Sequence, residues 1–350
     1  MREKENIKSN FNKEVEICFI SDIPEQVKNY FLNQLKQVSN VRITFPKDYS
    51  EENLIESVSE ADILIGWRPS KNILSHAKKL KVFINPGAGI HHLINDFKEI
   101  NKERNVILIN GHGNSYFVAQ HTIALLLALM NKIILHHNWM NQGIWRTGDK
   151  EAASIPLRFR KIGLLGYGAI NQKIHKMLSG FNNEFHILRR DWNKQSTTLP
   201  TEVVKYESNQ LHEFLEIIDI LIIALPVTSL TKEMIKEREL ELLGSTGLLV
   251  NVSRGEIINE EDLYFALRNR KILGAAIDVW YNYEPQSDKE GKKYPFNFPF
   301  HELDNIVLSP HRGYSPFKDL LRWDEIIENI RKFARGKQDL KNTVSLINEY

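Results

Sequence analysis

Short apolar runs alternate with stretches of helical period along the whole chain. In the first third, apolar runs of strand length are followed in most cases by proline, glycine or other turn residues. These runs are Val15–Ile20, Val41–Phe45, Ala61–Trp67, Leu80–Asn85 and Val106–Asn110. Segments such as Glu25–Val38 and Asn72–Lys79 lie between them and have the apolar spacing of helices. This alternation predicts a parallel sheet covered by helices.

The same pattern restarts after a long apolar-faced helix that we expect over Tyr116–His137. A strand at Lys161–Leu165 leads through a glycine turn into a helix at Ala169–Leu178. Further strands are expected at Phe185–Leu188, Ile220–Leu225, Leu248–Val252, Leu273–Asp278 and Ile306–Ser309, and a closing helix at Pro316–Ala334. The sequence therefore predicts an α/β fold with two doubly wound parallel-sheet domains.

Composition is that of a globular protein with ordinary domains. The 350 residues are 42% hydrophobic and 26% charged, enough for two cores. With 46 basic and 44 acidic residues the net charge is +2, which predicts neither a nucleic-acid nor a membrane partner. The single cysteine, Cys18, excludes an internal disulfide. The charged N-terminus lacks the apolar core of a signal peptide. The longest apolar stretch, Thr122–Leu135, is too short for a membrane span. We expect a cytoplasmic protein.

The turn after Lys161–Leu165 has the spacing of a dinucleotide site. Gly166 and Gly168 follow the strand and precede a helix that opens with Ala169 and Ile170. The first glycine permits the tight bend, and the second lets backbone amides approach a pyrophosphate at the helix N-terminus. Asn171 stands where the usual pattern has a third glycine, which predicts slightly looser packing of helix against strand.

The end of the next strand bears on the choice between NAD and NADP. An NAD site requires a carboxylate there, about 20 residues after the turn, to bind the ribose hydroxyls. This chain has Arg189 and Arg190, whose guanidinium groups suit a 2′-phosphate and offer no acceptor to a ribose. We expect NADP as the preferred cofactor, with NAD as the alternative if Asp191 supplies the carboxylate.

Several later segments together resemble the D-isomer-specific 2-hydroxyacid dehydrogenases. The segments Asp219–Thr228, Leu249–Leu263 and Gly274–Trp280 are followed by Glu284-Pro285 and Asn305–His311 in the order found in that family. Upstream, Asn85–Gly89 and Gly113–His121 also fit, although Gln120 stands where the family usually has glutamate. The likeness runs from about Ala61 to Tyr314.

The resemblance implies a Rossmann cofactor domain inserted in a split, flavodoxin-like substrate domain. Residues 1–112 and 314–350 would form the substrate domain and residues 113–313 the dinucleotide-binding domain. It also implies an active site in the cleft between the domains. The homodimer that it implies would use the helix near Tyr116–His137 and the Trp139–Trp145 segment. Besides the turn and the arginines, Pro226, Val252, Ser253 and Asp278 would contact the cofactor.

The implied chemistry is hydride transfer between NADP(H) or NAD(H) and a small 2-oxo or 2-hydroxy acid. Arg254 would hold the substrate carboxylate and polarise its carbonyl, and His311 would be the acid and base. Glu284 would orient the imidazole and favour its charged form. The backbone of Ala88 and Gly89 would donate to the carboxylate, and Arg68 is a weaker candidate for a second anionic group.

The position of Glu284 leaves an alternative open. In most relatives the glutamate follows the aspartate that matches Asp278 by five positions, whereas Glu284 follows it by six, so strict counting gives Tyr283. The Glu284-Pro285 dipeptide favours Glu284 with a one-residue bulge. A phenol, with a pKa near 10, offers no negative charge at neutral pH, and for that reason we choose Glu284.

The sequence argues against two other functions and against a metal site. A catalytically silent dinucleotide sensor, like the corepressors of this fold, is disfavoured by the presence of Arg254, Glu284 and His311 together. An enzyme of formate dehydrogenase type is expected to have glutamine where this chain has glutamate. Adjacent histidines, as in His91–His92 and His136–His137, point about 100° apart on a helix, and we expect no metal site. The sequence does not identify the substrate's side chain, the direction of the reaction or the pathway.

Overall fold

The structure, a computed structural model, describes residues 14–145, 152–193, 198–315 and 319–350. The chain divides into two compact units, Met1–Asn114 with Pro316–Tyr350, and Ser115–Ser315. The boundaries lie close to those expected at 112 and 313. The roles of the units as substrate and cofactor domains stay predictions at this point.

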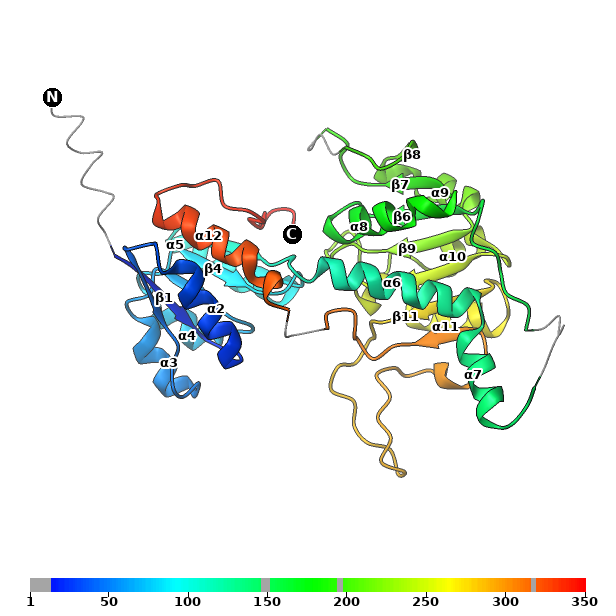
Figure 1. The fold of residues 1–350 in the computed structure, drawn as a ribbon, viewed down its shortest axis with the longest axis horizontal. Helices are drawn as coiled ribbons and strands as arrows, with labels where there is room; N and C mark the ends of the chain where they lie inside the picture. The colour runs from blue at the N-terminus through cyan, green and yellow to red at the C-terminus, as the bar shows by residue number, and fades with distance from the viewer. Residues whose placement is uncertain (1–13, 146–151, 194–197, 316–318) are drawn as a thin grey trace. The chain divides into compact units, whose positions relative to one another are not determined.

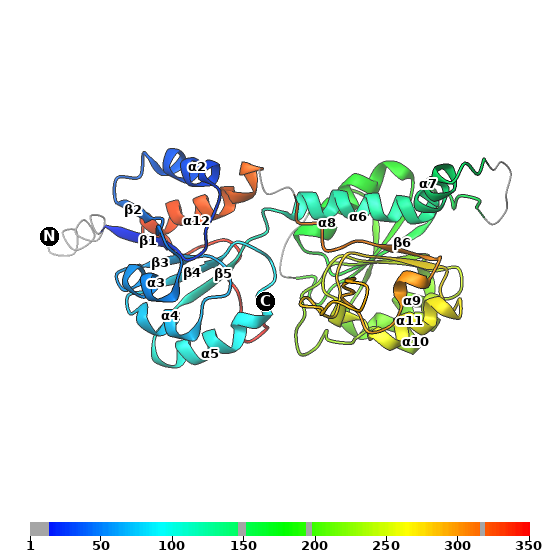
Figure 2. The same ribbon diagram turned by 90° about the horizontal axis from the view of Figure 1, so that it is seen from below.

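The first unit is built on a parallel sheet of five strands in the order β2-β1-β3-β4-β5, which are coloured from blue to cyan in Figure 1 and labelled in Figure 2. The strands are β1 (Val15–Phe19), β2 (Val41–Thr44), β3 (Ile63–Ile65), β4 (Val82–Asn85) and β5 (Ile107–Asn110). The helices are α2 (Glu25–Leu35), α3 (Glu51–Val58), α4 (Lys71–His76), α5 (Ile94–Glu103) and α12 (Asp324–Ala334). One core packs α2 and α12 on one face of the sheet, and a second packs α3, α4 and α5 on the other. This is the flavodoxin-like strand order.

The second unit has a parallel sheet of seven strands in the order β12-β11-β10-β9-β6-β7-β8, most of which are labelled in Figure 1. The strands are β6 (Lys161–Leu165), β7 (Glu184–Leu188), β8 (Val203–Tyr206), β9 (Ile220–Ile223), β10 (Leu248–Asn251), β11 (Gly274–Ile277) and β12 (Ile306–Leu308). The helices are α6 (Ser115–Met130), α7 (Ile133–Asn141), α8 (Ala169–Leu178), α9 (Leu211–Ile217), α10 (Glu237–Leu243) and α11 (Glu260–Arg268). α6 and α8 cover one face, and α9, α10 and α11 the other. The order reverses between β6 and β9, as in a Rossmann sheet.

The predicted fold class, two doubly wound parallel sheets, is confirmed, whereas one predicted helix is wrong. The helix expected over Tyr116–His137 ends at Met130, and α7 starts at Ile133 after a bend of 64°. Lys132 has a φ of 54°, in the left-handed region, and this conformation ends the regular hydrogen-bond ladder. Within the described residues no single helix passes as a membrane span, although α6 and α7 would pass together by length and composition alone.

Two further elements differ from the expectation. The edge strand β8 was not predicted because only Tyr206 of its four residues is buried, which leaves no apolar run to recognise. The closing helix expected over Pro316–Ala334 starts at Asp324, after a 3₁₀ turn at Leu320–Trp323, and residues 316–318 lie outside the described part.

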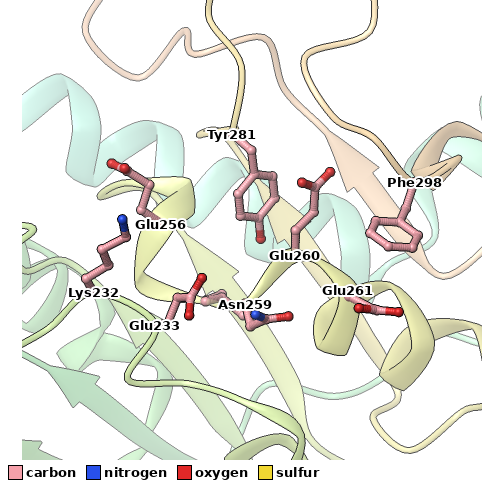
Figure 3. Close-up of a pocket in the computed structure, with 9 residues that line it drawn as sticks. Lys232, Glu233, Glu256, Asn259, Glu260, Glu261, Tyr281 and Phe298 are labelled. Carbon is pink, nitrogen blue, oxygen red and sulfur yellow. The ribbon is translucent and has the colours of Figure 1, made fainter.

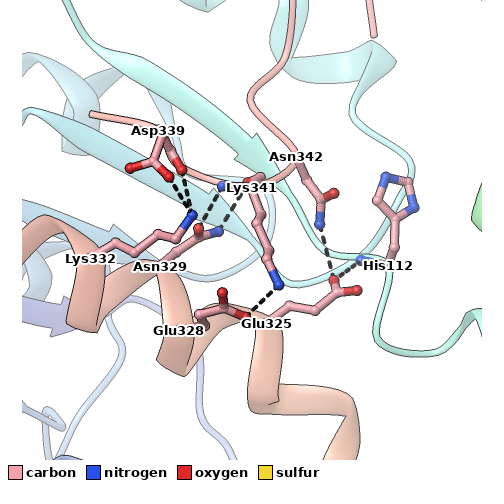
Figure 4. Close-up of polar contacts among 8 residues, drawn as sticks. All are labelled: His112, Glu325, Glu328, Asn329, Lys332, Asp339, Lys341 and Asn342. Atoms are coloured by element: carbon pink, nitrogen blue, oxygen red, sulfur yellow. Dashed lines mark hydrogen bonds and ion pairs between the residues drawn. The ribbon is translucent and has the colours of Figure 1, made fainter. Parts of the chain in front are cut away.

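Polar contacts of α12 join the two segments of the first unit (Figure 4). The Glu325 carboxylate accepts hydrogen bonds from the backbone N–H of His112 at 2.9 Å and from Asn342 Nδ2 at 3.0 Å. One helix turn further on, Asn329 exchanges hydrogen bonds with the backbone of Lys341 at 2.7 and 3.0 Å. The C-terminal segment is therefore attached through α12 to the chain just before the second unit begins.

We predict that Glu325→Ala lowers the free energy of unfolding of the full chain by about 1–3 kcal/mol, because two donors lose their half-buried acceptor. The matched control is Glu328→Ala on the same helix, which breaks a partly exposed ion pair with Lys341 and should cost less than about 1 kcal/mol. Urea unfolding followed by circular dichroism measures both. Equal losses in the two variants would contradict the structural role given to Glu325.

Candidate functional site

Most of the expected residues of the second unit follow the carboxyl ends of its strands, which meet at one edge of the sheet. The strand order puts Arg189 after β7, the glycine turn after β6, Pro226 after β9 and Arg254 after β10. Asp278 follows β11, and His311 lies beyond β12. The glycine turn and the arginines thus lie around β6 and β7, and Arg254, Asp278 and His311 around β10, β11 and β12. Ligands of doubly wound sheets bind at this edge, next to the point where the strand order reverses.

The Asp278 side chain holds the loop that carries His311. Asp278 is 1% exposed, and its carboxylate accepts the backbone N–H groups of Arg312 at 2.7 Å and Gly313 at 2.9 Å. It also accepts the Ser309 hydroxyl, and the Trp280 indole donates to the Ser309 carbonyl at 2.8 Å. These bonds lie on both sides of His311 in the sequence, so that the carboxylate fixes the course of the loop.

Asp278 carries its negative charge despite its burial. Burial alone would raise its pKa, but hydrogen bonds from His121, Ser309 and the two loop amides hold that pKa below the ordinary value. His121 Nε2 lies 3.3 Å from the Asp278 carboxylate and 2.9 Å from the Ser309 hydroxyl. Because both carboxylate oxygens are engaged by the loop, a cofactor contact of Asp278, as expected from the sequence, stays a prediction.

His311 lies between two tyrosine rings. Its imidazole meets Tyr283 at 5.3 Å between ring centroids and Tyr314 at 5.3 Å, both edge to face. Burial lowers the pKa of His311, the positive charge of Arg254 lowers it further, and the charge of Asp278 acts in the opposite direction. His311 itself has a φ of 53°, in the left-handed region, which the bonded loop around it maintains.

The structure does not bring Glu284 to His311. Glu284 is exposed, and its backbone N–H donates to Asn282 Oδ1 at 2.9 Å. Tyr283, like Tyr314, packs against the imidazole, and its position agrees with strict counting from Asp278. The Glu-Pro dipeptide lies in an exposed bend, and Glu284 as the catalytic carboxylate stays a prediction. The catalytic role of either residue is a matter for proposal.

Arg254 is a partly buried cation with no ion pair to any described residue. The buried Asn251 at the end of β10 shapes the turn before it: Nδ2 donates to the Arg254 carbonyl at 2.9 Å, and Oδ1 accepts from the Ser253 N–H and hydroxyl. The guanidinium donates to the Ser253 carbonyl at 2.6 Å. Burial lowers the pKa of Arg254, opposed by Tyr283 and Glu256 nearby, but a guanidinium stays charged at any ordinary pH.

The glycine after Arg254 is required by close packing. A Cβ on Gly255 would come within 2.6 Å of the Trp280 backbone. The Arg254 turn therefore lies directly against the strand exit that begins at Asp278. An unpaired cation, a histidine and a buried carboxylate are thus assembled in one unit, and an anionic ligand is the partner that this cation lacks.

The glycine turn after β6 has the geometry that a dinucleotide requires. Gly166 has a φ of 81°, and a Cβ there would approach Ala224 and Leu225 at 3.0 Å. A Cβ on Gly168 would meet open space, so that the backbone can be approached from outside. Asn171 is fully buried, and its Nδ2 donates to the carbonyls of Leu165 at 3.2 Å and Gly166 at 2.6 Å. Hydrogen bonds inside a packed interface therefore replace the third glycine, without the looser packing that we expected.

Arg189 lies beside this turn, since Leu165 pairs with Leu188 in the sheet. Its guanidinium lies 5.3 Å from the centre of the Trp192 ring, and the Lys205 ammonium lies 4.9 Å from the same ring. Asp191 Oδ1 accepts the backbone N–H of Asn193 at 2.8 Å, a local turn that occupies this oxygen. Arg190 is exposed. The cations at this strand end favour an anion rather than a ribose diol.

The other cofactor candidates lie at the same sheet edge. Ala169 and Ile170 are half-buried in the first turn of α8, Pro226 is exposed after β9, and Val252 and Ser253 are buried after β10. No set of histidine, cysteine and carboxylate side chains suited to a metal ion occurs among the described residues.

In the first unit, two buried asparagines hold the loop after β4. Asn85 Nδ2 donates to the carbonyls of Gly87 at 2.5 Å and Gly89 at 3.4 Å, and Asn110 Nδ2 donates to the Ala88 carbonyl at 3.0 Å. Because the C=O and N–H of a trans peptide point in opposite directions, the N–H groups of Ala88 and Gly89 face away from the asparagines. This loop offers adjacent amide donors to an anion.

Arg68 follows β3 at the same sheet edge of the first unit. It is exposed, has a φ of 49° and makes no ion pair within the described part of the chain. The preceding Trp67 donates its backbone N–H to the Ser21 hydroxyl at 3.1 Å. Arg68 is available to an anionic ligand, but its exposure makes it a weaker anchor than Arg254.

A separate pocket of the second unit contains none of the expected residues (Figure 3). Its volume is about 300 Å³, and Glu233, Glu256, Glu260, Tyr281 and Phe298 are among its lining residues. Glu260 already accepts the backbone N–H and the side chain of Asn297. The pocket is therefore not the site that the sequence predicts.

Comparison with known proteins agrees with this geometry. A family model described as "D-isomer specific 2-hydroxyacid dehydrogenase, NAD binding domain" matches residues 123–313. The glyoxylate reductase of Thermococcus onnurineus is 30% identical over 304 residues, 83% of this chain and 85% of that enzyme. The D-3-phosphoglycerate dehydrogenase of Methanocaldococcus jannaschii is 28% identical over 323 residues, 90% of this chain but only 57% of that enzyme's length.

Among solved structures, a D-isomer specific 2-hydroxyacid dehydrogenase from Xanthobacter autotrophicus, in complex with NADPH and MES, has the same fold. The TM-score is 0.77, with 22% identity over 96% of this chain and 100% of that one.

Proposed function

This chain belongs to the D-isomer specific 2-hydroxyacid dehydrogenase family, and from that premise we propose that it reduces a small 2-oxo acid to the D-2-hydroxy acid with NADPH or NADH. The observation that carries the proposal is Arg254, a partly buried cation without a counter-ion in the described residues, close to a histidine whose loop is held by Asp278. None of the relatives named above is described as a sensor or corepressor, and none supports that alternative.

In the proposed reaction Arg254 binds the substrate carboxylate and polarises the 2-oxo group. The bound nicotinamide supplies the hydride that adds to the carbonyl carbon. His311, in its imidazolium form, gives a proton to the developing alkoxide, so that a hydroxyl forms and a neutral imidazole remains. We propose that the amides of Ala88 and Gly89 also bind the carboxylate, and that Arg68 binds a second anionic group where the substrate has one.

Tyr283 modifies this scheme, because the residue beside His311 is not a carboxylate. We propose that Tyr283 packs against and orients the imidazole, and that Asp278 supplies the negative charge that stabilises its protonated form. The negative charge of Asp278 raises the pKa of His311, although the carboxylate oxygens of Asp278 are hydrogen-bonded to the loop. Reduction should then be fastest at mildly acidic pH, because the pKa of His311 is lowered.

We predict that Tyr283→Glu raises the pKa of His311, since it adds a negative charge near the imidazole. Reduction needs protonated His311, and the alkaline limb of its pH profile for kcat/KM should therefore move to higher pH by about one unit or more. Glu284→Gln is the control and should leave the limb in place, whereas His311→Ala should abolish it and cost about 10²–10⁴-fold in rate. A limb that moves in Glu284→Gln and not in Tyr283→Glu would restore Glu284 as the partner.

For Arg254 we predict that Arg254→Lys lowers kcat/KM on 2-oxo acids by about 10²-fold or more, because lysine keeps the charge but loses the planar fork. Steady-state assays against a panel of 2-oxo acids measure this, with cofactor affinity from fluorescence titration. Arg270→Lys, at an exposed ion pair with Asp304, is the control and should change neither quantity. A parallel loss of cofactor affinity in Arg254→Lys would make Arg254 a cofactor or structural residue.

The preference for NADP over NAD is the next part of the proposal. We propose that Arg189, with Arg190 beside it, binds the 2′-phosphate. The Arg189 guanidinium makes no ion pair with a described residue, and Asp191 bonds to its own loop.

We predict that Arg189→Asp shifts the ratio of kcat/KM for NADPH over NADH by at least about tenfold, since a charge-assisted hydrogen bond contributes about 1.5–3 kcal/mol. Asp191→Asn preserves the local turn and should leave the ratio unchanged. If instead Asp191→Asn weakens NADH and Arg189→Asp has no effect, Asp191 is the ribose acceptor and the enzyme prefers NAD.

We also propose that the protein is a homodimer. Apolar side chains along α7 and the residues after it are unusually exposed, with Ile133 52%, Ile134 51%, Met140 56% and Trp145 78% accessible. A second copy of the same face would bury such a stripe symmetrically.

Sedimentation of the full chain should accordingly give twice the mass of one chain. The double variant Ile134→Glu and Met140→Glu should give a monomer at micromolar concentration, because it puts charges into the apolar contact. Ile217→Glu, at an exposed apolar position of α9, should remain dimeric. A wild-type monomer would overturn the dimer proposal without affecting the proposed reaction.

A further inference from the structure

Three consecutive carbonyls of the glycine turn are bonded to side chains of α8. Besides the two bonds from Asn171, Gln172 Nε2 donates to the Tyr167 carbonyl at 3.3 Å. Since the N–H of a trans peptide points away from its C=O, the N–H groups of Tyr167 and Gly168 face the other side of the turn. The side chains of α8 thus orient the amides that a phosphate would meet.

The Asn171 side chain has an energetic cost, and this cost indicates why an asparagine stands at this position. Asn171 Oδ1 is buried and has no hydrogen-bond partner, although Asn171 Nδ2 has two. The reverse orientation of the amide would set Oδ1 against two carbonyl oxygens, so the network assigns the orientation. An unpaired buried acceptor is destabilising, and glycine at this position would avoid it. Asn171 therefore serves as a donor to the turn.

A second set of hydrogen bonds holds the glycine turn through a buried histidine, His175. Tyr167, between the two glycines, is 6% exposed, and its hydroxyl lies 2.8 Å from Nδ1 of the fully buried His175. His175 Nε2 lies 2.8 Å from Thr201 Oγ1. The Thr201 hydroxyl donates to the Glu202 carbonyl at 2.9 Å, and its oxygen must then accept from Nε2–H. Nδ1 is left as the acceptor for Tyr167.

These groups form a column of neutral hydrogen bonds that all run in one direction. Burial lowers the pKa of His175 to about 4, in agreement with a neutral ring at physiological pH. The Phe185 ring packs on the imidazole at 4.2 Å between centroids. The Tyr167 and His175 side chains of this column are buried and Thr201 is half-buried, and such a hydrogen-bonded network holds its members in one geometry.

The column connects the glycine turn with the strand that supports Arg189. Thr201 lies just before β8, and the carbonyl of Tyr206 at the end of β8 accepts the backbone N–H of Arg189 at 3.2 Å and the Trp192 indole at 3.0 Å. In addition, the positive charge of Arg189 lowers the pKa of Tyr167, against the larger, opposite effect of burial. The glycine turn and Arg189 are therefore linked by the hydrogen-bonded column and also by this charge.

We propose that Tyr167, His175 and Thr201 are positioning residues for the cofactor, which hold the pyrophosphate turn and the Arg189 site as one rigid unit. This inference rests on the proposed function, since it concerns how the same dinucleotide is held. None of the three residues needs to touch the cofactor for this role. They differ in this from Arg189 and from the amides of the turn.

The test uses Tyr167→Phe and Thr201→Val, which each remove one hydroxyl, and the double variant. Fluorescence titration with NADPH and NADH gives the dissociation constants, and steady-state assays give kcat. Each single variant should weaken NADPH binding about three- to tenfold with kcat within about twofold of wild type. Because either substitution breaks the same column, the double variant should lose less than the product of the two factors. His175→Leu should match the double variant.

Thr122→Val is the matched control. It removes a buried hydroxyl that donates to the Val118 carbonyl at 2.7 Å within α6, in the same unit but not in the turn or the strand beside Arg189. It should lower stability to a similar degree and leave both dissociation constants unchanged. Unchanged cofactor affinity in Tyr167→Phe and Thr201→Val, or factors that simply multiply, would overturn the inference. A wild-type protein that binds neither dinucleotide would overturn the proposed function, and the inference with it.

Discussion

Backbone polar groups that are buried at the carboxyl ends of the parallel strands need hydrogen-bond partners. The positions of the candidate residues depend on which side chains supply these partners. At four strand ends a buried asparagine or aspartate supplies them: Asn85 ends β4, Asn110 ends β5, Asn251 ends β10 and Asp278 follows β11. Each side chain bonds to the backbone of a nearby loop. The loops that carry the candidate site are therefore rigid extensions of the sheet, which is what a preorganised site requires.

The electrostatics of the site follow from the same arrangement. Arg254 and His311 are two potential cations in a partly buried region, and Asp278 is the carboxylate whose charge acts on His311 from within the loop. Burial lowers the pKa of His311 most, and an anionic substrate on Arg254 would offset the further lowering by the Arg254 charge. Substrate binding would then itself raise the pKa of the acid that the reduction needs.

Much of the fold could be predicted from the sequence because apolar runs report burial directly. Lys161–Leu165 and Ala169–Leu178 have the bounds that we expected, and the other strand candidates lie on observed strands. β8 and the break at Lys132 could not be found in this way, since an edge strand lacks an apolar run and a left-handed residue has no reliable sequence signal.

At the site, the types of residue were easier to predict than their partners. Arg254 and His311 stand out in ordered motifs, but the packing of Tyr283 beside His311 depends on the path of a loop that the motifs do not specify. The bonds from Asp278 to Arg312 and Gly313, and from His175 to Thr201, join residues far apart in the chain. Pattern and spacing contain no information on such contacts, and only the three-dimensional structure reveals them.

The most direct test of the account is the pKa of His311 itself, measured by NMR titration of the isotope-labelled imidazole. We predict a value below about 6.5, the ordinary value for histidine, in the free protein. We further predict a rise on addition of oxamate, a non-reducible analogue of a 2-oxo acid, in the presence of cofactor. A pKa at or above the ordinary value in the free protein, unchanged by oxamate, would contradict the claim that burial and Arg254 lower the pKa of His311 and that the substrate's charge raises it again.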